Sequence, residues 1–166
     1  MTTGKALTEM LDATLHRGPD SAGWALYRAP LADDLRLRFF VAPGETGDEE
    51  IRFIHSRLEL EGARVVEGWK EGCSYGLRVE YPGNLLSLTR AVERVCRPVS
   101  MGRSLDIIKD VGLPRPLADR YGITDFDGTH GLAHIRLATE SGVHPDTSHP
   151  FWASGSRRSS CSIRSC

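Results

Sequence analysis

Hydrophobic positions recur along most of this chain at the spacings typical of amphipathic helices and of half-buried strands. Helical spacing predicts helices over residues 5–16, 48–60, 84–95, 105–111 and 114–121. Alternating or short apolar runs predict strands over residues 24–27, 35–41, 63–66, 74–81, 98–103 and 132–138. Because the two kinds of element alternate irregularly and without an internal repeat, the pattern favours a layered α+β domain.

Local signals predict where two of these helices end or begin. Gly18 and Pro19 follow the first helix, where glycine can take the left-handed cap conformation and proline prevents continuation. Thr46 and Glu49 have the spacing of a capping box, which predicts the start of the second helix near residue 48.

The hydrophobic pattern stops at about residue 153. Residues 154–166 are rich in serine, arginine and cysteine and have no hydrophobic period, so no element is predicted there and disorder is the first interpretation. The second interpretation is a frameshift, because a GC-rich gene read out of frame yields such a composition. We therefore predict one domain over residues 1–153 and a separate tail over residues 154–166.

The composition narrows the possible partners. The 166 residues suffice for one domain with a core, and 40% hydrophobic with 26% charged residues is ordinary for a globular protein. A formal net charge of -1 gives no electrostatic case for a nucleic-acid or membrane partner, and no apolar run approaches the ~18 residues that span a bilayer. A cytoplasmic location is expected, with ordinary thiols at Cys73, Cys96, Cys161 and Cys166.

One arginine stands out in the apolar run over residues 132–138. Burying a guanidinium without a partner costs several kcal/mol, so Arg136 in a buried strand suggests a fixed anion beside it. A substrate carboxylate held by two parallel hydrogen bonds is one such partner. A protein carboxylate, from Asp127 or Glu140, is the alternative. Thr139 and Glu140 follow the run and add a hydroxyl and a carboxylate at its end.

The sequence around this arginine resembles a known family. His-Ile-Arg-Leu-Ala-Thr-Glu-Ser at residues 134–141, followed by Ser-His-Pro-Phe at 148–151, is similar to the glutamine-binding segment of class II glutamine amidotransferases. A second signature, His-Arg-Gly-Pro-Asp-Ser-Ala-Gly at residues 16–23, resembles the helix-turn-strand beside the nucleophile of that family. The similarity is greatest to the stand-alone subunits that accompany glutamate-synthase-like and N-methylglutamate-synthase-like enzymes.

The resemblance implies both a fold and a set of site residues. The expected fold is the four-layer αββα sandwich of N-terminal-nucleophile hydrolases, here incomplete. Arg136 would hold the α-carboxylate of glutamine, with Thr139 and Glu140 as further substrate-binding residues. Arg17 and Asp20, which can pair to brace their turn, would support the site, as would His134. The family implies glutamine as ligand, a synthase-type partner subunit that receives ammonia, and no cofactor.

The nucleophile of the family is missing from the printed sequence. The family attacks glutamine with an N-terminal cysteine, whereas this chain begins Met-Thr-Thr-Gly and its first cysteine, Cys73, cannot supply an α-amine base. Thr2 is the one substitute to weigh, but the strand that would present it is absent. The His-Asn-Gly segment expected after Phe151 is also absent. We therefore assign no catalytic residue and expect an inactive chain, through a start site placed too far downstream, a frameshift or a truncated gene.

Two other kinds of protein compete with this interpretation. Histidines suit a zinc hydrolase, and the C-terminal part holds His130, His134, His144 and His149. On a strand, however, His130 and His134 would lie ~13 Å apart, too far for one ion, so no metal is predicted. The remaining alternatives are a non-catalytic amino-acid-binding module that keeps Arg136 as its carboxylate anchor, and a non-functional fragment.

Overall fold

The computed structural model describes residues 1–18, 20–137, 144–154 and 160–162. These residues fall into two compact units, the first built mainly from Met1–Ala29 and Ile107–Trp152 and the second mainly from Pro30–Asp106. Helices and antiparallel strand pairs occur in both units, which confirms the α+β class. The four-layer arrangement and the single domain over residues 1–153 stay predictions.

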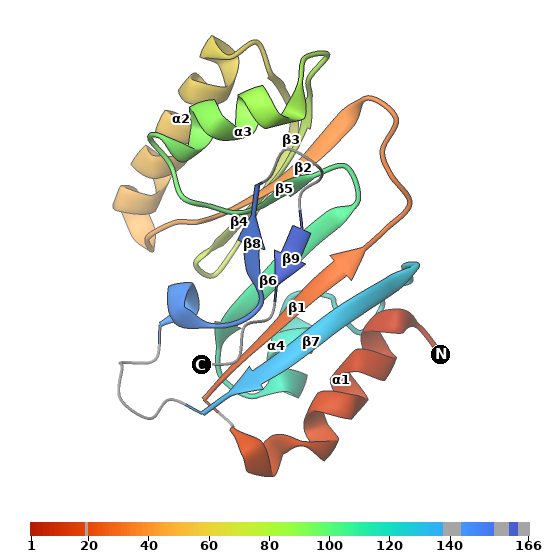
Figure 1. The fold of residues 1–166 in the computed structure, drawn as a ribbon. Coiled ribbons are helices and arrows are strands. Elements are labelled where there is room, and N and C mark those ends of the chain that lie inside the picture. Colours follow the sequence, from red (N-terminus) through yellow and green to blue (C-terminus); the bar gives the residue numbers. More distant parts are fainter. Residues whose placement is uncertain (19, 138–143, 155–159, 163–166) are drawn as a thin grey trace. The chain divides into compact units, whose positions relative to one another are not determined.

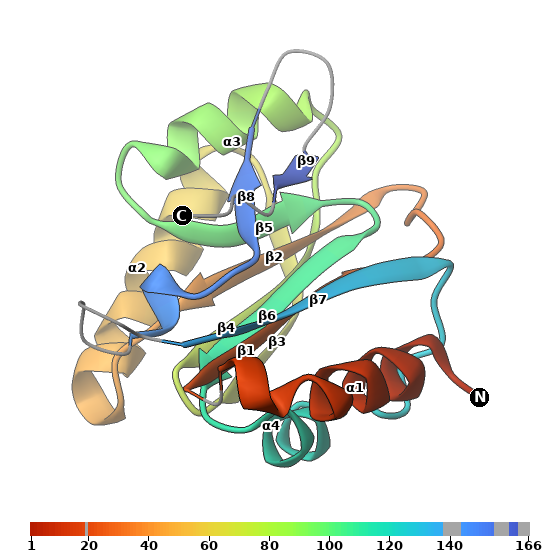
Figure 2. The same cartoon turned by 60° about the horizontal axis from the view of Figure 1, so that its bottom comes forward.

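The first unit is a three-stranded sheet with two helices. The sheet has the order β6-β1-β7, and its elements are β1 (Ser21–Tyr27), β6 (Leu105–Val111), β7 (His130–Arg136), α1 (Thr3–Ala13) and α4 (Pro114–Arg120). Both helices lie together on one face of the sheet (Figures 1 and 2). Strand β1 runs antiparallel to β7, with Ser21 opposite Arg136 and Tyr27 opposite His130.

The core of the first unit lies between that sheet and its helices. Its buried residues come from α1, β1, β6, α4 and the segment between α4 and β7. They are Leu11, Ala22, Trp24, Leu26, Ile108, Leu117, Ala118, Ile123 and Phe126. Helix α1 begins at Thr3, two residues before its predicted start, and the Thr2 side chain caps it by accepting a hydrogen bond from the backbone N–H of Lys5. A short 3-10 turn, η1 (Leu15–Arg17), follows the helix, so the predicted helix over 5–16 is confirmed apart from its last turn.

The second unit is a four-stranded antiparallel sheet with two helices. The sheet has the order β3-β4-β2-β5, and its elements are β2 (Asp34–Phe40), β3 (Arg64–Glu71), β4 (Ser74–Glu80), β5 (Pro98–Gly102), α2 (Gly44–Leu60) and α3 (Leu85–Glu93). Helices α2 and α3 lie on the same side of this sheet (Figures 1 and 2). The Asn84 side chain caps α3 by accepting hydrogen bonds from the backbone N–H groups of Leu86 and Ser87.

Three predictions about the secondary structure are wrong. Leu105–Val111, predicted as a helix, is strand β6, and it is buried on both faces, so its apolar residues do not alternate. The capping box at Thr46 and Glu49 does not form, because α2 begins earlier, at Gly44. In the tail, Ser160–Ser162 forms strand β9 beside β8 (Phe151–Ala153), where no element was predicted; residues 155–159 and 163–166 lie outside the described part.

In the parts of the chain that the structure describes, no helix combines the length and the apolar character needed to cross a bilayer.

Candidate functional site

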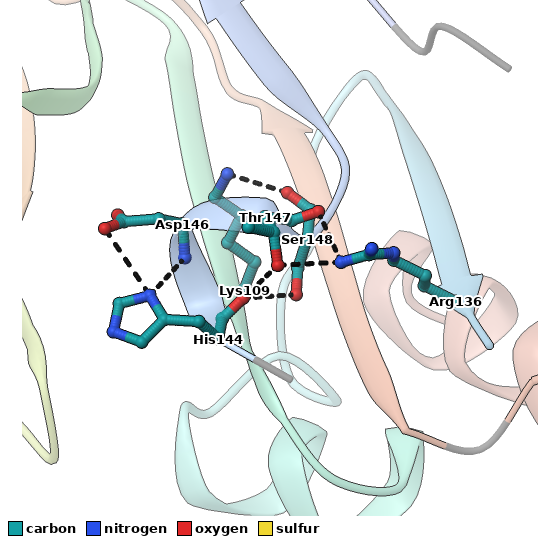
Figure 3. A network of polar contacts seen from close by, with 6 residues as sticks. All are labelled: Lys109, Arg136, His144, Asp146, Thr147 and Ser148. Carbon is teal, nitrogen blue, oxygen red and sulfur yellow. Dashed lines mark hydrogen bonds and ion pairs between the residues drawn. The ribbon is translucent and has the colours of Figure 1, made fainter. Parts of the chain in front are cut away.

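Arg136, the residue singled out by its motif, is the last residue of β7. Its Nη1 donates hydrogen bonds to the carbonyl oxygen of Thr147 at 2.9 Å and to the Thr147 hydroxyl at 2.7 Å. Thr147 ends a 3-10 turn, η2 (Pro145–Thr147), which Figure 3 shows beside the end of β7. The guanidinium is thus held in a fixed place by a turn that is close in sequence but was not predicted as its partner.

Arg136 does not lie in a buried strand, which corrects the expectation drawn from the apolar run around it. Every residue of β7 is half-buried or exposed, so β7 is not the buried strand that its apolar run suggested. Arg136 itself is half-buried. The guanidinium contacts Thr147, while Thr139 and Glu140 lie outside the described residues. Partial exposure leaves the arginine accessible to a dissolved ligand, which a fully buried guanidinium would not be.

A buried lysine fixes the same segment from the opposite edge of the sheet. Lys109 on β6 is only 5% exposed, and its Nζ donates a hydrogen bond of 2.7 Å to the carbonyl oxygen of Ser148. The same Nζ lies 4.5 Å from the centre of the Phe151 ring, within range of a cation–π interaction. Sequence reasoning missed Lys109, although a lysine inside an apolar run was the same kind of signal that drew attention to Arg136.

Two histidine rings pack against each other next to this lysine. The ring centres of His134 on β7 and His149 are 4.6 Å apart, and His149 also meets the Phe151 ring edge-on at 4.8 Å. Burial, with the neighbouring His149 as a second cause, lowers the pKa of His134 from its usual 6.5. The structure therefore brings His134 together with the Ser-His-Pro-Phe motif, while its supporting role stays a prediction.

The lowered pKa of His134 predicts acid sensitivity. His134 takes up a proton near pH 6.5 in the unfolded chain and only at lower pH in the folded protein. The contribution of His134 to the free energy of unfolding should therefore be constant above pH 7 and fall as the pH drops through about 6.5. We expect His134→Gln, which cannot titrate, to lose less stability than the wild type between pH 7.5 and 5.5. Urea unfolding at both pH values measures this, and an equal loss in the two proteins would contradict it.

The turn before β1 touches the end of β7. The backbone N–H of Asp20 donates to the carbonyl oxygen of Arg136 at 3.2 Å, and Gly18 approaches Leu137 so closely that an added Cβ would overlap its backbone. The Asp20 carbonyl accepts from the N–H of Gly112 at 2.9 Å. Arg17 is exposed, and Pro19 lies outside the described residues. Asp20 thus contacts the end of β7 through its backbone. Its support of the site and its bracing pair with Arg17 stay predictions.

Thr2, the residue weighed as a nucleophile, lies at the other end of β7. Its hydroxyl donates to the carbonyl oxygen of Thr124 at 2.6 Å and caps α1. Thr124 comes shortly before β7, whereas Arg136 ends it, and the two ends of a seven-residue strand are separated by ~20 Å. Cys73 and Cys96 belong to the second unit.

The histidines of the zinc alternative are divided among different places. His130 stacks on the Tyr27 ring at 4.3 Å, His144 accepts a hydrogen bond at the start of η2, and only His134 and His149 meet. Because β7 is a strand, the spacing argument against a His130–His134 ion holds. Among the described residues, no three histidine, cysteine, aspartate or glutamate side chains are placed to hold a metal ion.

The described arrangement is a small α+β layer with an arginine fixed at a strand end, which suits the binding of a carboxylate. The chain is 32% identical over 152 residues to "Glutamine amidotransferase-like protein GlxB" of Rhizobium meliloti, covering 89% of this chain and 48% of that protein. It is 30% identical over 158 residues to a Methanothermobacter thermautotrophicus protein named "Putative glutamine amidotransferase", covering 89% of this chain and 51% of that one. No protein-family model matches the chain.

These similarities support the glutamine amidotransferase family for this chain. The chain spans about half the length of these two relatives.

Proposed function

We propose that this chain is a class II glutamine amidotransferase domain that binds glutamine through Arg136. The observation that carries the proposal is the meeting of three motif segments, the first of which is far in sequence from the other two. The turn of residues 16–23 reaches Arg136 through Asp20, and the Ser-His-Pro-Phe segment reaches His134 through His149. A guanidinium can bind the α-carboxylate of glutamine by parallel, charge-assisted hydrogen bonds.

The finer assignments follow from the same proposal. The fold would be the N-terminal-nucleophile type in an incomplete αββα form, and the ammonia would pass to a synthase-type partner subunit. For the printed chain we propose binding without hydrolysis, because Thr2, the one candidate nucleophile weighed from its sequence, is engaged in capping α1 at the far end of β7. Release of glutamate, followed with a coupled dehydrogenase assay, would contradict the proposed lack of hydrolysis and leave the proposed binding intact.

Replacing Arg136 tests the binding proposal. Arg136→Met keeps much of the side chain's length and removes its charge, so we expect the affinity for L-glutamine to fall at least ~30-fold, or about 2 kcal/mol. Isothermal titration calorimetry on the full chain measures the affinity. Arg115→Met is the matched control, because Arg115 also belongs to the first unit but pairs with Asp12 at the surface. Equal binding by Arg136→Met and the wild type would reject Arg136 as the anchor.

A further inference from the structure

Strand β3 forms an open edge of the sheet in the second unit. It is the last strand in the order β3-β4-β2-β5, and among the described residues its backbone hydrogen-bonds with β4 alone. All eight of its residues are half-buried or exposed. The Trp69 ring lies over Gly76 of β4 and is therefore directed away from the outer edge. Such an edge presents backbone N–H and C=O groups on which a further strand can pair.

A bulge decides which side chains of β3 share a face of the sheet. The register against β4 shifts by one residue between Val65 and Glu67. Because alternate residues of β4 point to the same face, their partners on β3 do so as well. One face therefore carries four residues of β3, namely Arg64, Glu67, Trp69 and Glu71. The other face carries the three that lie opposite buried residues of β4, namely Val65, Gly68 and Lys70.

The charges of β3 are complementary to those of a second β3 strand. The strand has two cations and two anions, with Arg64 at its first position and Glu71 at its last. When two copies of β3 pair antiparallel about a two-fold axis at Gly68, Arg64 of each copy lies opposite Glu71 of the other, on the same face. Opposite charges facing each other across paired strands stabilise the pairing. Nε of Arg64 already donates to Glu80 at 3.0 Å, so Glu71 of the second copy would complete a network of three charges.

A hollow beside this edge gives room for a side chain of the second copy. It has a volume of about 530 Å³ and is lined by His55, Glu59, Gly62, Ala63, Arg64 and Val65. The same two-fold pairing places Lys70 of the second copy opposite Val65, at the border of the hollow, where the Glu59 carboxylate attracts its ammonium. Within its own chain Lys70 pairs with Asp48 at 3.3 Å, an exposed contact weak enough to be exchanged.

We propose that β3 is the contact surface for a second copy of this chain. The two four-stranded sheets join edge to edge through antiparallel β3 strands, with Gly68 at the two-fold axis and an Arg64–Glu71 pair at each end. In a two-fold contact every pair occurs twice, so a single substitution acts at two places. The contact needs no ligand and is independent of the proposed binding of glutamine.

Charge reversal at the two ends of β3 tests this contact. Sedimentation equilibrium on the full chain should show the wild type approaching twice the monomer mass of 18.3 kDa as its concentration rises. Arg64→Glu places two anions opposite each other and Glu71→Arg two cations, so each single variant should raise the dissociation constant of the dimer at least ~tenfold. The double variant restores opposite charges and should return to within about threefold of the wild type.

A control separates the pairing from a general effect of charge reversal. Arg115→Glu also breaks an exposed ion pair, with Asp12, but lies in the first unit, so it should dimerise as the wild type does. Arg64 and Glu71 are exposed, so we expect all variants to keep the circular dichroism spectrum of the wild type.

Each other outcome overturns the inference. A wild-type protein that stays monomeric at every concentration would reject the contact altogether. A dimer that neither single reversal weakens would use a different surface. A dimer that both single variants weaken and the double variant does not restore would show that Arg64 and Glu71 do not face each other. None of these results affects the proposed function, which the Arg136→Met titration tests separately.

Discussion

Replacing Asp106 by alanine is expected to lower the free energy of unfolding by about 3–5 kcal/mol. The Asp106 carboxylate accepts hydrogen bonds from Nε and Nη2 of Arg38 at 2.7 and 2.8 Å, and Nη1 of Arg38 donates to the Ser74 hydroxyl at 2.8 Å. The side chains of Arg38 and Asp106 are only 4% and 10% exposed. The substitution takes the carboxylate away and leaves the guanidinium in a site that water cannot readily reach, which is the costly case for a buried charge.

Urea unfolding followed by circular dichroism measures this change, and two controls make it specific. Glu80→Ala removes the partner of Arg64 in an ion pair whose side chains are 66% and 45% exposed, so a change within about 1 kcal/mol is expected. The double substitution Arg38→Met with Asp106→Leu removes both charges and should recover most of the loss, because apolar replacement of a buried pair is often neutral. A single Asp106→Ala variant as stable as Glu80→Ala would show that the pair is not a stabilising feature.

The pair of Arg38 with Asp106 shows which parts of the fold could not be predicted from the sequence. Helix α3 and its Asn84 cap were predictable because their signals are local, lying within a few residues of each other. Strand β6 was not, because Asp106 and Lys109 in its run indicate a solvated helix face when their partners are unknown. Those partners, Arg38 and Ser148, lie far away in sequence, so only the folded chain shows why two charges can be buried there.

The candidate site was predictable to a similar extent. The motifs identified Arg136 and His134, because a short motif can be read directly from the sequence. The physical reason first given for Arg136, burial in a core strand, was wrong. The burial of a strand depends on which distant segments cover it, and the local sequence does not encode this. Thr147 belongs to no motif, and a threonine in a turn has many possible roles. Its contact with Arg136 could therefore be found only from the folded structure.

Gly23 belongs to the motif at residues 16–23, and the structure leaves no room for a side chain there, so substituting it should disturb the site directly. It is the last residue of this motif. In the structure, an added Cβ would overlap the carbonyl oxygen of His149 and lie 2.8 Å from Cβ of Lys109 and 2.9 Å from Cδ of Pro150. Gly23 is also directly opposite His134 in the pairing of β1 with β7. The absence of a side chain here is what lets the His-Pro segment lie against the strand.

Gly23→Ala should therefore lower the free energy of unfolding by about 3 kcal/mol, because the backbone at His149 cannot yield as a flexible side chain does. Displacing that segment would also part His149 from His134 and Ser148 from Lys109, so glutamine affinity should fall in protein that remains folded. Urea unfolding and calorimetry on the same preparation separate these two effects. Gly102→Ala is the matched control, since a Cβ at this strand-end glycine would meet Leu105 only at an ordinary 3.8 Å. If both variants were equally stable and bound glutamine equally well, close contact at Gly23 would not be what positions the segment.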